Sequence, residues 1–257
     1  MSRSISNVET RSFTFSGISL KYNDPHDIAA IIENFVLDVY KIGNIHNGDT
    51  VIDLGAGIGE FSVLASKRVG KDGKVIAVEP SLEDYNTLLI NLRENNCENV
   101  TPLNMAVSDR SETLPLEFKS RKFECKANSL FNILNDINID SHRLKFMKMD
   151  IEGGERLVIP SSINIIKRLR FLAIEIHDGY SSDLVPLMQN LGFEFRRITR
   201  SEYLMSALWK TLSHPFESYQ IFRAFKKSGE YPGFRKITNG IDISASNNLM
   251  VGLFTRL

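Results

Sequence analysis

The chain has 257 residues, and its 31 basic and 31 acidic side chains leave a formal net charge of zero. This balance excludes a strong overall attraction to nucleic acid or to an anionic membrane. The two cysteines exclude a disulfide framework. Because no apolar run approaches the ~20 residues of a membrane helix and the start lacks the apolar core of a signal peptide, we expect one large α/β domain with an appendage, in the cytoplasm.

The N-terminal region alternates apolar and polar residues on both sides of a Ser-Gly pair within residues 11–22. This pattern predicts a β-hairpin whose buried side chains are Phe13, Phe15, Ile18 and Leu20. Asp24 and Pro25 then predict the N-cap and the first position of a helix. We therefore expect residues 1–46 to form a hairpin and a helix ahead of a main domain, residues 47–257.

A glycine-rich loop follows the first apolar run of that domain. The run ends in Asp53, and Gly55, Gly57 and Gly59 alternate after it before a helical pattern begins. Glycines let the chain turn tightly and let a ligand approach, and the helix start offers unpaired N–H groups to an anionic group. A dinucleotide-binding loop would have glycine where Glu60 stands. Since that carboxylate would repel a pyrophosphate but not an ammonium group, the loop favours S-adenosylmethionine (SAM).

The next apolar run, residues 74–78, ends in Glu79-Pro80. An acid at the tip of a second parallel strand is positioned to accept hydrogen bonds from both ribose hydroxyls. Folds that bind NAD share this feature, so Glu79 supports an adenosine ligand without choosing between the two cofactors. Ser81 predicts the N-cap of a helix over residues 81–95.

The middle of the chain has weaker patterns. Residues 100–107 predict a third strand, and residues 114–118 predict another, at a sheet edge because Pro115 cannot donate a hydrogen bond. Residues 129–134 predict a short helix. The stretch before that helix reads as a loop near the ligand, with the basic side chains Arg121, Lys122 and Lys126.

Two further strands end in acidic side chains. Residues 144–149 predict the fourth strand, with Asp150 at its carboxyl end, where such sheets bind ligands. Glu152 projects on the same side if the chain stays extended. In the fifth strand Glu175 and His177 share one face by the same alternation. Because a carboxylate in an apolar strand is costly to bury alone, we expect Glu175 to have a partner.

The C-terminal part predicts a helix over residues 183–191, a sixth strand over 193–198 and a last strand over 248–255. Between these two strands lie residues 199–247, too long for a simple connection. This insertion is basic and partly helical in pattern. It is either a substrate cap or anion-binding surface, or a solvated appendage or contact in a homodimer.

These motifs together resemble the FkbM family of SAM-dependent methyltransferases. Four elements carry the resemblance: residues 53–61, Glu79-Pro80, residues 148–153 and residues 174–177. The Lys-x-Asp-x-Glu-Gly element at 148–153 is the most specific, and Gly154 stands where the family usually has alanine. The resemblance implies a Rossmann-like class I methyltransferase fold: a mostly parallel seven-stranded sheet flanked by helices, with an antiparallel last strand beside the fifth. It also implies O-methylation of a small molecule or sugar hydroxyl.

The resemblance also implies which residues bind SAM. The loop after the third strand would flank adenine, and either Asp150 or Asp53 would face the α-ammonium group. The implied cofactor-binding residues are Asp53, Gly55, Ala56, Gly57, Gly59, Glu60, Phe61, Glu79, Pro80, Ser81, Met105, Ala106, Val107 and Asp150.

Methyl transfer to a hydroxyl requires a group that accepts its proton. His177 is the predicted base because imidazole titrates near neutrality, and Asp150, Glu152 and Glu175 are alternative bases or orient it. A second hypothesis has Asp150, Glu175 and His177 bind a divalent metal that lowers the pKa of the acceptor. The structural alternative is that the same side chains form a hydrogen-bonded cluster.

Three other functions compete with this prediction. The basic insertion is compatible with a tRNA or rRNA methyltransferase, although no Asn-Pro-Pro-Tyr or Asp-Pro-Pro-Tyr element follows the fourth strand and no RNA-binding module is recognisable. An NAD-linked oxidoreductase agrees with Glu79 but not with Glu60. A non-catalytic SAM-binding protein would have little use for acidic strand tips.

Overall fold

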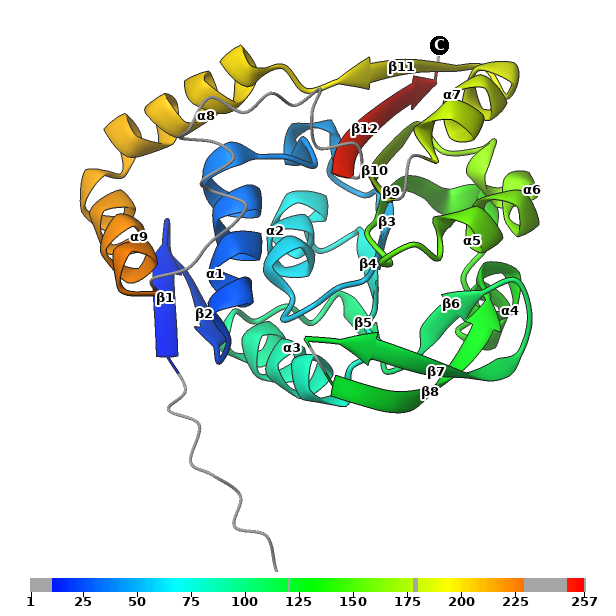
Figure 1. The fold of residues 1–257 in the computed structure, drawn as a ribbon, viewed down its shortest axis with the longest axis horizontal. Coiled ribbons are helices and arrows are strands. Elements are labelled where there is room, and N and C mark those ends of the chain that lie inside the picture. Colours follow the sequence, from blue (N-terminus) through cyan, green and yellow to red (C-terminus); the bar gives the residue numbers. More distant parts are fainter. Residues whose placement is uncertain (1–10, 120, 178–179, 229–248, 257) are drawn as a thin grey trace, which may run out of the picture.

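A computed structural model describes residues 11–119, 121–177, 180–228 and 249–256 (Figure 1). Within these residues seven strands form one sheet in the order β11-β12-β10-β9-β3-β4-β5. The strand β12 is antiparallel to both of its neighbours, and the other pairs are parallel. This is the predicted class I methyltransferase topology. The strands are β3 (Thr50–Leu54), β4 (Lys74–Val78), β5 (Val100–Leu103), β9 (Leu144–Met149), β10 (Phe171–His177), β11 (Phe193–Arg197) and β12 (Leu249–Arg256).

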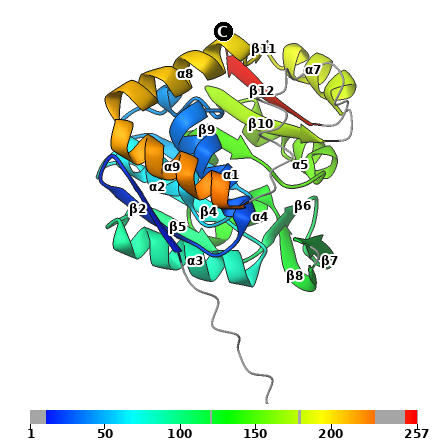
Figure 2. The same cartoon turned by 60° about the vertical axis from the view of Figure 1, so that its left-hand side comes forward.

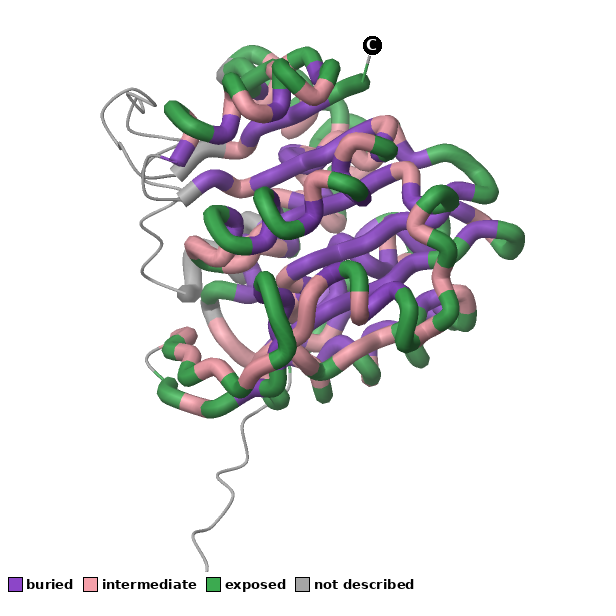
Figure 3. The backbone as a smooth tube through the Cα atoms, turned by 90° about the vertical axis from the view of Figure 1, so that its right-hand side faces the viewer, coloured by how far each residue is buried: buried purple, intermediate pink, exposed green. Residues whose placement is uncertain are grey.

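Helices cover both faces of the sheet because alternate residues of its buried strands point to opposite sides. In β3, Val51 joins one apolar core, while Ile52 and Leu54 join the other. The strands are buried along most of their length (Figure 3). The first core includes α1 (Pro25–Ile32), α2 (Glu60–Val69) and α3 (Leu82–Glu94), and the second includes α4 (Leu130–Asp136), α5 (Glu155–Ser161), α6 (Ile163–Ile166) and α7 (Ser181–Asn190).

The N-terminal hairpin consists of β1 (Arg11–Phe15) and β2 (Ile18–Tyr22), as predicted. Two amide side chains tie it to α3: Lys21 N donates to Asn91 Oδ1 at 2.6 Å, and Ser19 N donates to Asn95 Oδ1 at 3.0 Å. The predicted cap of α1 is also confirmed, with Asp24 as N-cap. Hairpin and α1 therefore share a core with the sheet rather than standing apart from it.

The region after β5 differs from the prediction. The predicted third strand ends at Leu103, and the chain then enters a separate sheet of order β6-β8-β7. Its strands are β6 (Ala106–Ser108), β7 (Glu112–Phe118) and β8 (Arg121–Ser129). The predicted loop is thus the strand β8, because its exposed lysines alternate with Phe123, Cys125 and Ala127, which pack inward. The strand β7 is at the sheet edge, as Pro115 predicted. We call the β7–β8 hairpin the arm.

The insertion begins with two helices, α8 (Arg200–Ser213) and α9 (Pro215–Ser228), which confirms its helical pattern. They pack over β1, over α1 and over the π-helical turn η1 (Glu33–Leu37) (Figure 2). Residues 229–248 of the insertion lie outside the described residues. The remaining short elements are the 3-10 turns η2 (Ile42–Asn44) and η3 (Ser141–Arg143). None of the helices in the described ranges has the length and apolar character that crossing a bilayer requires.

Candidate functional site

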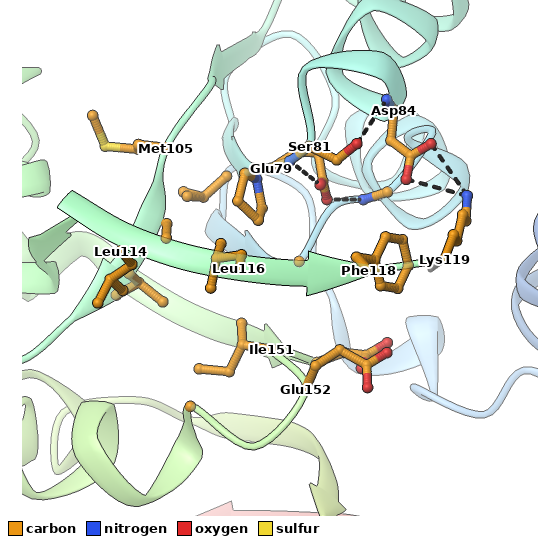
Figure 4. Close-up of a pocket in the computed structure, with 18 of the residues that line it drawn as sticks. Glu79, Ser81, Asp84, Met105, Leu114, Leu116, Phe118, Lys119, Ile151 and Glu152 are labelled. Carbon is orange, nitrogen blue, oxygen red and sulfur yellow. Dashed lines mark hydrogen bonds and ion pairs between the residues drawn. The ribbon is translucent and has the colours of Figure 1, made fainter. Parts of the chain in front are cut away.

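A cavity of about 470 Å³ opens at the carboxyl ends of β3, β4 and β9. Its size is in the usual range of small-molecule and cofactor sites. The glycine loop after β3, the arm, the start of α1 and the turn after β9 form its walls (Figure 4). The topology of parallel strands explains its position, because ligands bind at the carboxyl edge of such sheets.

The glycine loop is shaped by close backbone contacts. Gly55 has φ +76°, and a Cβ atom there would lie 1.7 Å from the Asp150 carbonyl oxygen. Gly59 has φ +92°, and its Cβ would collide with Leu88. Both glycines therefore allow the loop to pass against its neighbours in a backbone conformation that other residues rarely adopt. Gly55 and Gly57 both line the cavity, so the loop presents its backbone to a ligand at these positions.

Glu79 lies at the tip of β4, as predicted, and lines the cavity. Gly57 N donates to its Oε2 atom and Ser81 N to its Oε1 atom, both at 2.7 Å. Burial raises the pKa of Glu79 to about 8, although these backbone donors oppose the shift. Each carboxylate oxygen can accept a further hydrogen bond, so the side chain is held in position with acceptor capacity remaining for two hydroxyl groups.

One end of the cavity is apolar. Met105, Ala106 and Val107, which the resemblance assigns to the adenine site, line it. Leu114 and Leu116 of the arm, in the same three-stranded sheet as Ala106 and Val107, also line the cavity (Figure 4). The contribution of the arm was not predicted, although the alternating leucines of an edge strand were visible in the sequence. The arrangement forms an apolar slot suited to a flat aromatic base.

Glu60, in the first turn of α2, has a buried carboxyl group in the cavity wall. It is 5% exposed, and its Oε2 atom has no hydrogen-bond partner among the described residues. Burial raises the pKa of Glu60 to about 8. An unpartnered buried carboxyl group costs free energy, and a cationic ligand would compensate it. The wall therefore fits the ammonium and sulfonium charges of SAM and does not fit a pyrophosphate.

Beneath the cavity a buried lysine holds the strand tips together. Lys148, in β9, is 1% exposed; its Nζ lies 3.3 Å from Asp53 Oδ1 and 3.7 Å from Asp150 Oδ2, and it donates to the Gly55 carbonyl oxygen. Ser62 Oγ donates to Asp53 Oδ2 at 2.7 Å. Burial alone lowers the pKa of Lys148, but the neighbouring carboxylates outweigh it and raise this pKa. The lysine of the family-like motif is thus a structural counter-ion.

The predicted cofactor-binding residues divide into two sets. Those in the cavity wall are Gly55, Gly57, Glu60, Glu79, Pro80, Ser81, Met105, Ala106, Val107 and Asp150. Those behind the wall, each buried, are Asp53, Ala56 and Phe61, together with the loop residue Gly59. Asp53 faces Lys148, so Asp150 rather than Asp53 reaches the ligand space.

A buried tyrosine links Asp150, which lines the cavity, to the acid near the end of the neighbouring strand β10. The hydroxyl of Tyr40 is 3.1 Å from Asp150 Oδ2 and 3.3 Å from Glu175 Oε2. Glu33, on η1, interacts electrostatically with both carboxyl groups. We call Glu33, Tyr40, Asp150 and Glu175 the acidic group. Tyr40 supplies the partner that Glu175 required, but it lies 110 and 135 residues from the two acids, so no local pattern could reveal it.

Burial and mutual repulsion set the protonation of the acidic group. Burial, and then Asp150, raise the pKa of Glu33 to about 7. Burial, followed by Asp150 and Glu33, raises the pKa of Glu175 well above its usual value. Burial, and then Asp150 and Glu175, raise the pKa of Tyr40 as well. Glu33 and Glu175 therefore favour their protonated forms more than free carboxyl groups do, and Asp150 is the member of the group that lines the cavity.

One predicted catalytic residue, Glu152, is placed differently from the expectation, and a second, His177, is described only by its backbone. The chain does not stay extended after Asp150: β9 ends at Met149, and Glu152 sits in a turn with φ +53°. Glu152 nevertheless lines the cavity (Figure 4). The backbone of His177 pairs with Leu249, but its side chain lies outside the described residues. In the described part of the chain, no three His, Cys, Asp or Glu side chains are grouped to hold a metal ion.

A buried cluster of one lysine and two aspartates lines a part of the cavity to which the sequence analysis assigned no residue. Lys119, in the turn of the arm, lies with its Nζ 2.8 Å from Asp27 Oδ1 of α1 and 3.2 Å from Asp84 Oδ1 of α3. The three side chains are only 14, 5 and 9% exposed. Figure 4 shows Lys119 and Asp84 at the end of the arm. The arm is thereby tied to the helices on the far side of the cavity.

Comparison with known families and curated proteins gives consistent matches. The family model for the methyltransferase FkbM domain matches residues 53–195. The ubiquinone/menaquinone biosynthesis C-methyltransferase UbiE of Blochmanniella floridana is 29% identical over 179 residues, which cover 68% of this chain and 66% of that protein. UbiE of Escherichia coli O1:K1 / APEC is 24% identical over 182 residues, covering 69% of this chain and 67% of that protein. The match to the first of these relatives thus spans slightly under two thirds of its length.

Solved structures also match at low identity. A SAM-dependent methyltransferase from Aquifex aeolicus is 19% identical with a TM-score of 0.42, covering 68% of this chain and 92% of that chain. M. jannaschii TYW2 in complex with AdoMet is 14% identical with a TM-score of 0.48, covering 98% of this chain and 89% of that chain. At these sequence identities and TM-scores, the two structures carry no information about the methyl acceptor of this chain.

Proposed function

Because the chain belongs to the FkbM family of SAM-dependent methyltransferases, we propose that it methylates a hydroxyl group of a small molecule or sugar. The family match decides against an NAD-linked oxidoreductase, in agreement with Glu60 at the third glycine position. One observation supports a hydroxyl acceptor above the others: Asp150 lines the cavity and is hydrogen-bonded through Tyr40 to Glu175.

In this proposal the cavity wall holds SAM by three contacts of different chemistry. The carboxylate of Glu79 accepts hydrogen bonds from ribose hydroxyls. The carboxylate of Glu60 compensates the positive charge of the ligand, and the slot between Val107 and Leu116 takes the adenine ring. SAM itself supplies an already activated methyl group. The protein therefore needs chiefly to orient the acceptor and remove its proton.

The acidic group provides the proton acceptor. Asp150 takes the proton of the acceptor hydroxyl as its oxygen bonds to the methyl carbon and the bond from that carbon to sulfur breaks. Tyr40 orients the Asp150 carboxylate by donating its single hydroxyl proton to it, and Glu175, whose raised pKa favours its protonated form, lies within hydrogen-bond distance of the same hydroxyl oxygen. General-base catalysis of this kind contributes about 10²- to 10⁴-fold in rate. His177 stays a predicted base, to be distinguished from Asp150 by experiment.

The test is to incubate the purified protein with methyl-labelled SAM and separate acceptor pools: sugars, hydroxylated small molecules, aromatic quinone precursors and tRNA. We expect label in the first two pools, on oxygen, as assigned by mass spectrometry and NMR. Transfer to a carbon atom, the chemistry named for the UbiE relatives, or to RNA alone would overturn the proposal. Once an acceptor is known, Asp150→Asn should lower kcat about 100-fold, whereas His177→Gln should not.

Chelation distinguishes the metal hypothesis in the same assay. Preincubation with EDTA should leave the rate unchanged if the acidic group acts as base. Loss of activity with EDTA and its restoration by Mg²⁺ would instead assign the carboxylates a metal-binding role.

A further inference from the structure

The helix α8 presents an apolar face to solvent. Five large side chains on it are between 51 and 71% exposed: Leu204, Met205, Leu208, Trp209 and Leu212. Their spacing of one, three and four residues places them on one continuous stripe of the helix. Single exposed apolar residues are ordinary, but a contiguous patch marks an interaction surface.

The inward side of α8 is less apolar than this outer stripe. Ser206 Oγ donates to the Val36 carbonyl oxygen of η1 at 2.9 Å, and Tyr203 and Ala207 join the core beside it. Lys210 lies over the ring of Phe15, 5.8 Å from its centroid. A surface helix normally has the reverse polarity. Packing against the rest of the described chain therefore does not account for the outer stripe.

The next helix, α9, also exposes large side chains, here two aromatic residues and an arginine. Phe216 and Tyr219 are 69 and 62% exposed, and Arg223 follows one turn later, also exposed. Residues 196–228 contain seven lysines and arginines but two glutamates, in a chain whose formal net charge is zero. The segment that contains the apolar stripe therefore has an excess of positive charge in its sequence. We call the exposed apolar residues of α8 together with Phe216 and Tyr219 the apolar face.

We propose that the apolar face docks the protein on an anionic phospholipid surface. Interfacial helices combine an apolar stripe that enters the headgroup boundary with cations that meet anionic lipids. Tryptophan and tyrosine favour this boundary because their rings are apolar with a polar edge. A second copy of the chain fits less well, because a twofold contact would bring the same positive segments together.

Trp209 allows a direct test, since it is the only tryptophan of the chain and is 71% exposed. Its fluorescence is measured in buffer, with phosphatidylcholine vesicles, and with vesicles that also contain phosphatidylglycerol. We expect a blue shift and higher intensity with the anionic vesicles, weakened by added salt. No change with anionic vesicles would overturn the proposal. Emission that is already blue in buffer would mean that another part of the protein covers this face, and would overturn it too.

Paired variants separate docking from misfolding and from methyl transfer. Leu208→Ser combined with Leu212→Ser should lower co-flotation with anionic vesicles about tenfold, as expected for losing part of the burial of two leucines. Phe131→Ser is the control, because Phe131 is 61% exposed on α4. SAM affinity should be unchanged in both variants, so failure of docking and failure of the proposed function remain distinguishable. Equal flotation of both variants, or a dimer in buffer that only the leucine variant dissociates, would overturn the proposal.

Discussion

The two ends of the site, the cavity wall around Glu60 and Glu79 and the acidic group, are built in different ways. The first comes from consecutive elements, residues 53–81. The second is assembled from residues far apart in the chain, joined by the hydroxyl of Tyr40. Both ends hold buried carboxyl groups with a raised pKa. They differ in compensation: the Oε2 atom of Glu60 has no partner, whereas Asp150 and Glu175 share one.

That difference indicates distinct tasks. An unpartnered carboxyl group gains most when a cationic ligand arrives, so Glu60 suits binding. A hydrogen-bonded acid network holds its members in fixed orientation, so Asp150 suits proton transfer. Lys148 lies between the two ends and contacts both Asp53 and Asp150.

The largest expected effect is on Lys148, which both ends need. Replacing it by methionine leaves Asp53 and Asp150 without their buried counter-ion, and breaking such a pair costs about 3–5 kcal/mol. We expect a strongly lowered unfolding midpoint in urea, with loss of SAM binding. Lys145→Met is the control, since Lys145 is on the same strand but donates to the His142 carbonyl oxygen instead. Equal stability of the two variants would contradict the assigned role.

The second prediction sharpens the division between the ends. Tyr40→Phe and Glu175→Gln disturb the acidic group without touching the cavity wall, so kcat should fall about 10- to 100-fold. SAM affinity by calorimetry should stay within about threefold. A loss of SAM affinity equal to the loss in kcat would show that the acidic group serves cofactor binding. The two ends of the site would then not have separate tasks.

The third prediction concerns Glu60 and pH. Because its pKa is raised to about 8, SAM affinity should increase as pH rises from 6 to 8 and the carboxylate forms. Glu60→Gln should bind SAM about tenfold more weakly, which is typical for a hydrogen bond to a charged group, and should flatten this pH dependence. Calorimetry at three pH values measures both.

Glu60→Gln weakens SAM binding but should stabilise the fold at high pH. A carboxyl group whose folded-state pKa is raised stabilises the fold at low pH and loses that contribution as pH rises through about 8. The variant should therefore unfold at a higher temperature than the unmodified protein at pH 8.5, by about 2–4 °C per kcal/mol, and the difference should vanish near pH 4. A variant that is less stable at pH 8.5 would contradict the assigned protonation.

The smallest expected effect concerns the arm. Lys119→Ala removes the tie to Asp27 and Asp84, so the arm should exchange its amide hydrogens faster and SAM affinity should fall a few-fold. Lys122→Ala is the matched control, because Lys122 is on the same hairpin with 82% of its side chain exposed. Surface pairs of that kind contribute about 0–1 kcal/mol. Equal exchange in both variants would show that the ion pair does not hold the arm.

Predictions from local pattern were accurate where the pattern was strong. The strand before Asp53, the glycine loop and Glu79 at the tip of β4 are confirmed. The arm shows why weaker patterns failed. The strand β8 alternates correctly, but its lysines on the exposed face suggested a loop. Glu152 was misjudged for a related reason: the direction of a side chain depends on φ, which here is +53°.

The sequence by itself determined the elements whose information is local: the hydrophobic periodicity of the strands, the glycine loop and the acids that end each strand. Only the tertiary structure decided which of those acids lie beside Tyr40, which face Lys148, and that Lys119 lines the cavity. The reason is physical. Periodicity and caps depend on residues a few positions apart, whereas burial, pKa and partner depend on packing between segments more than 100 residues apart in the chain.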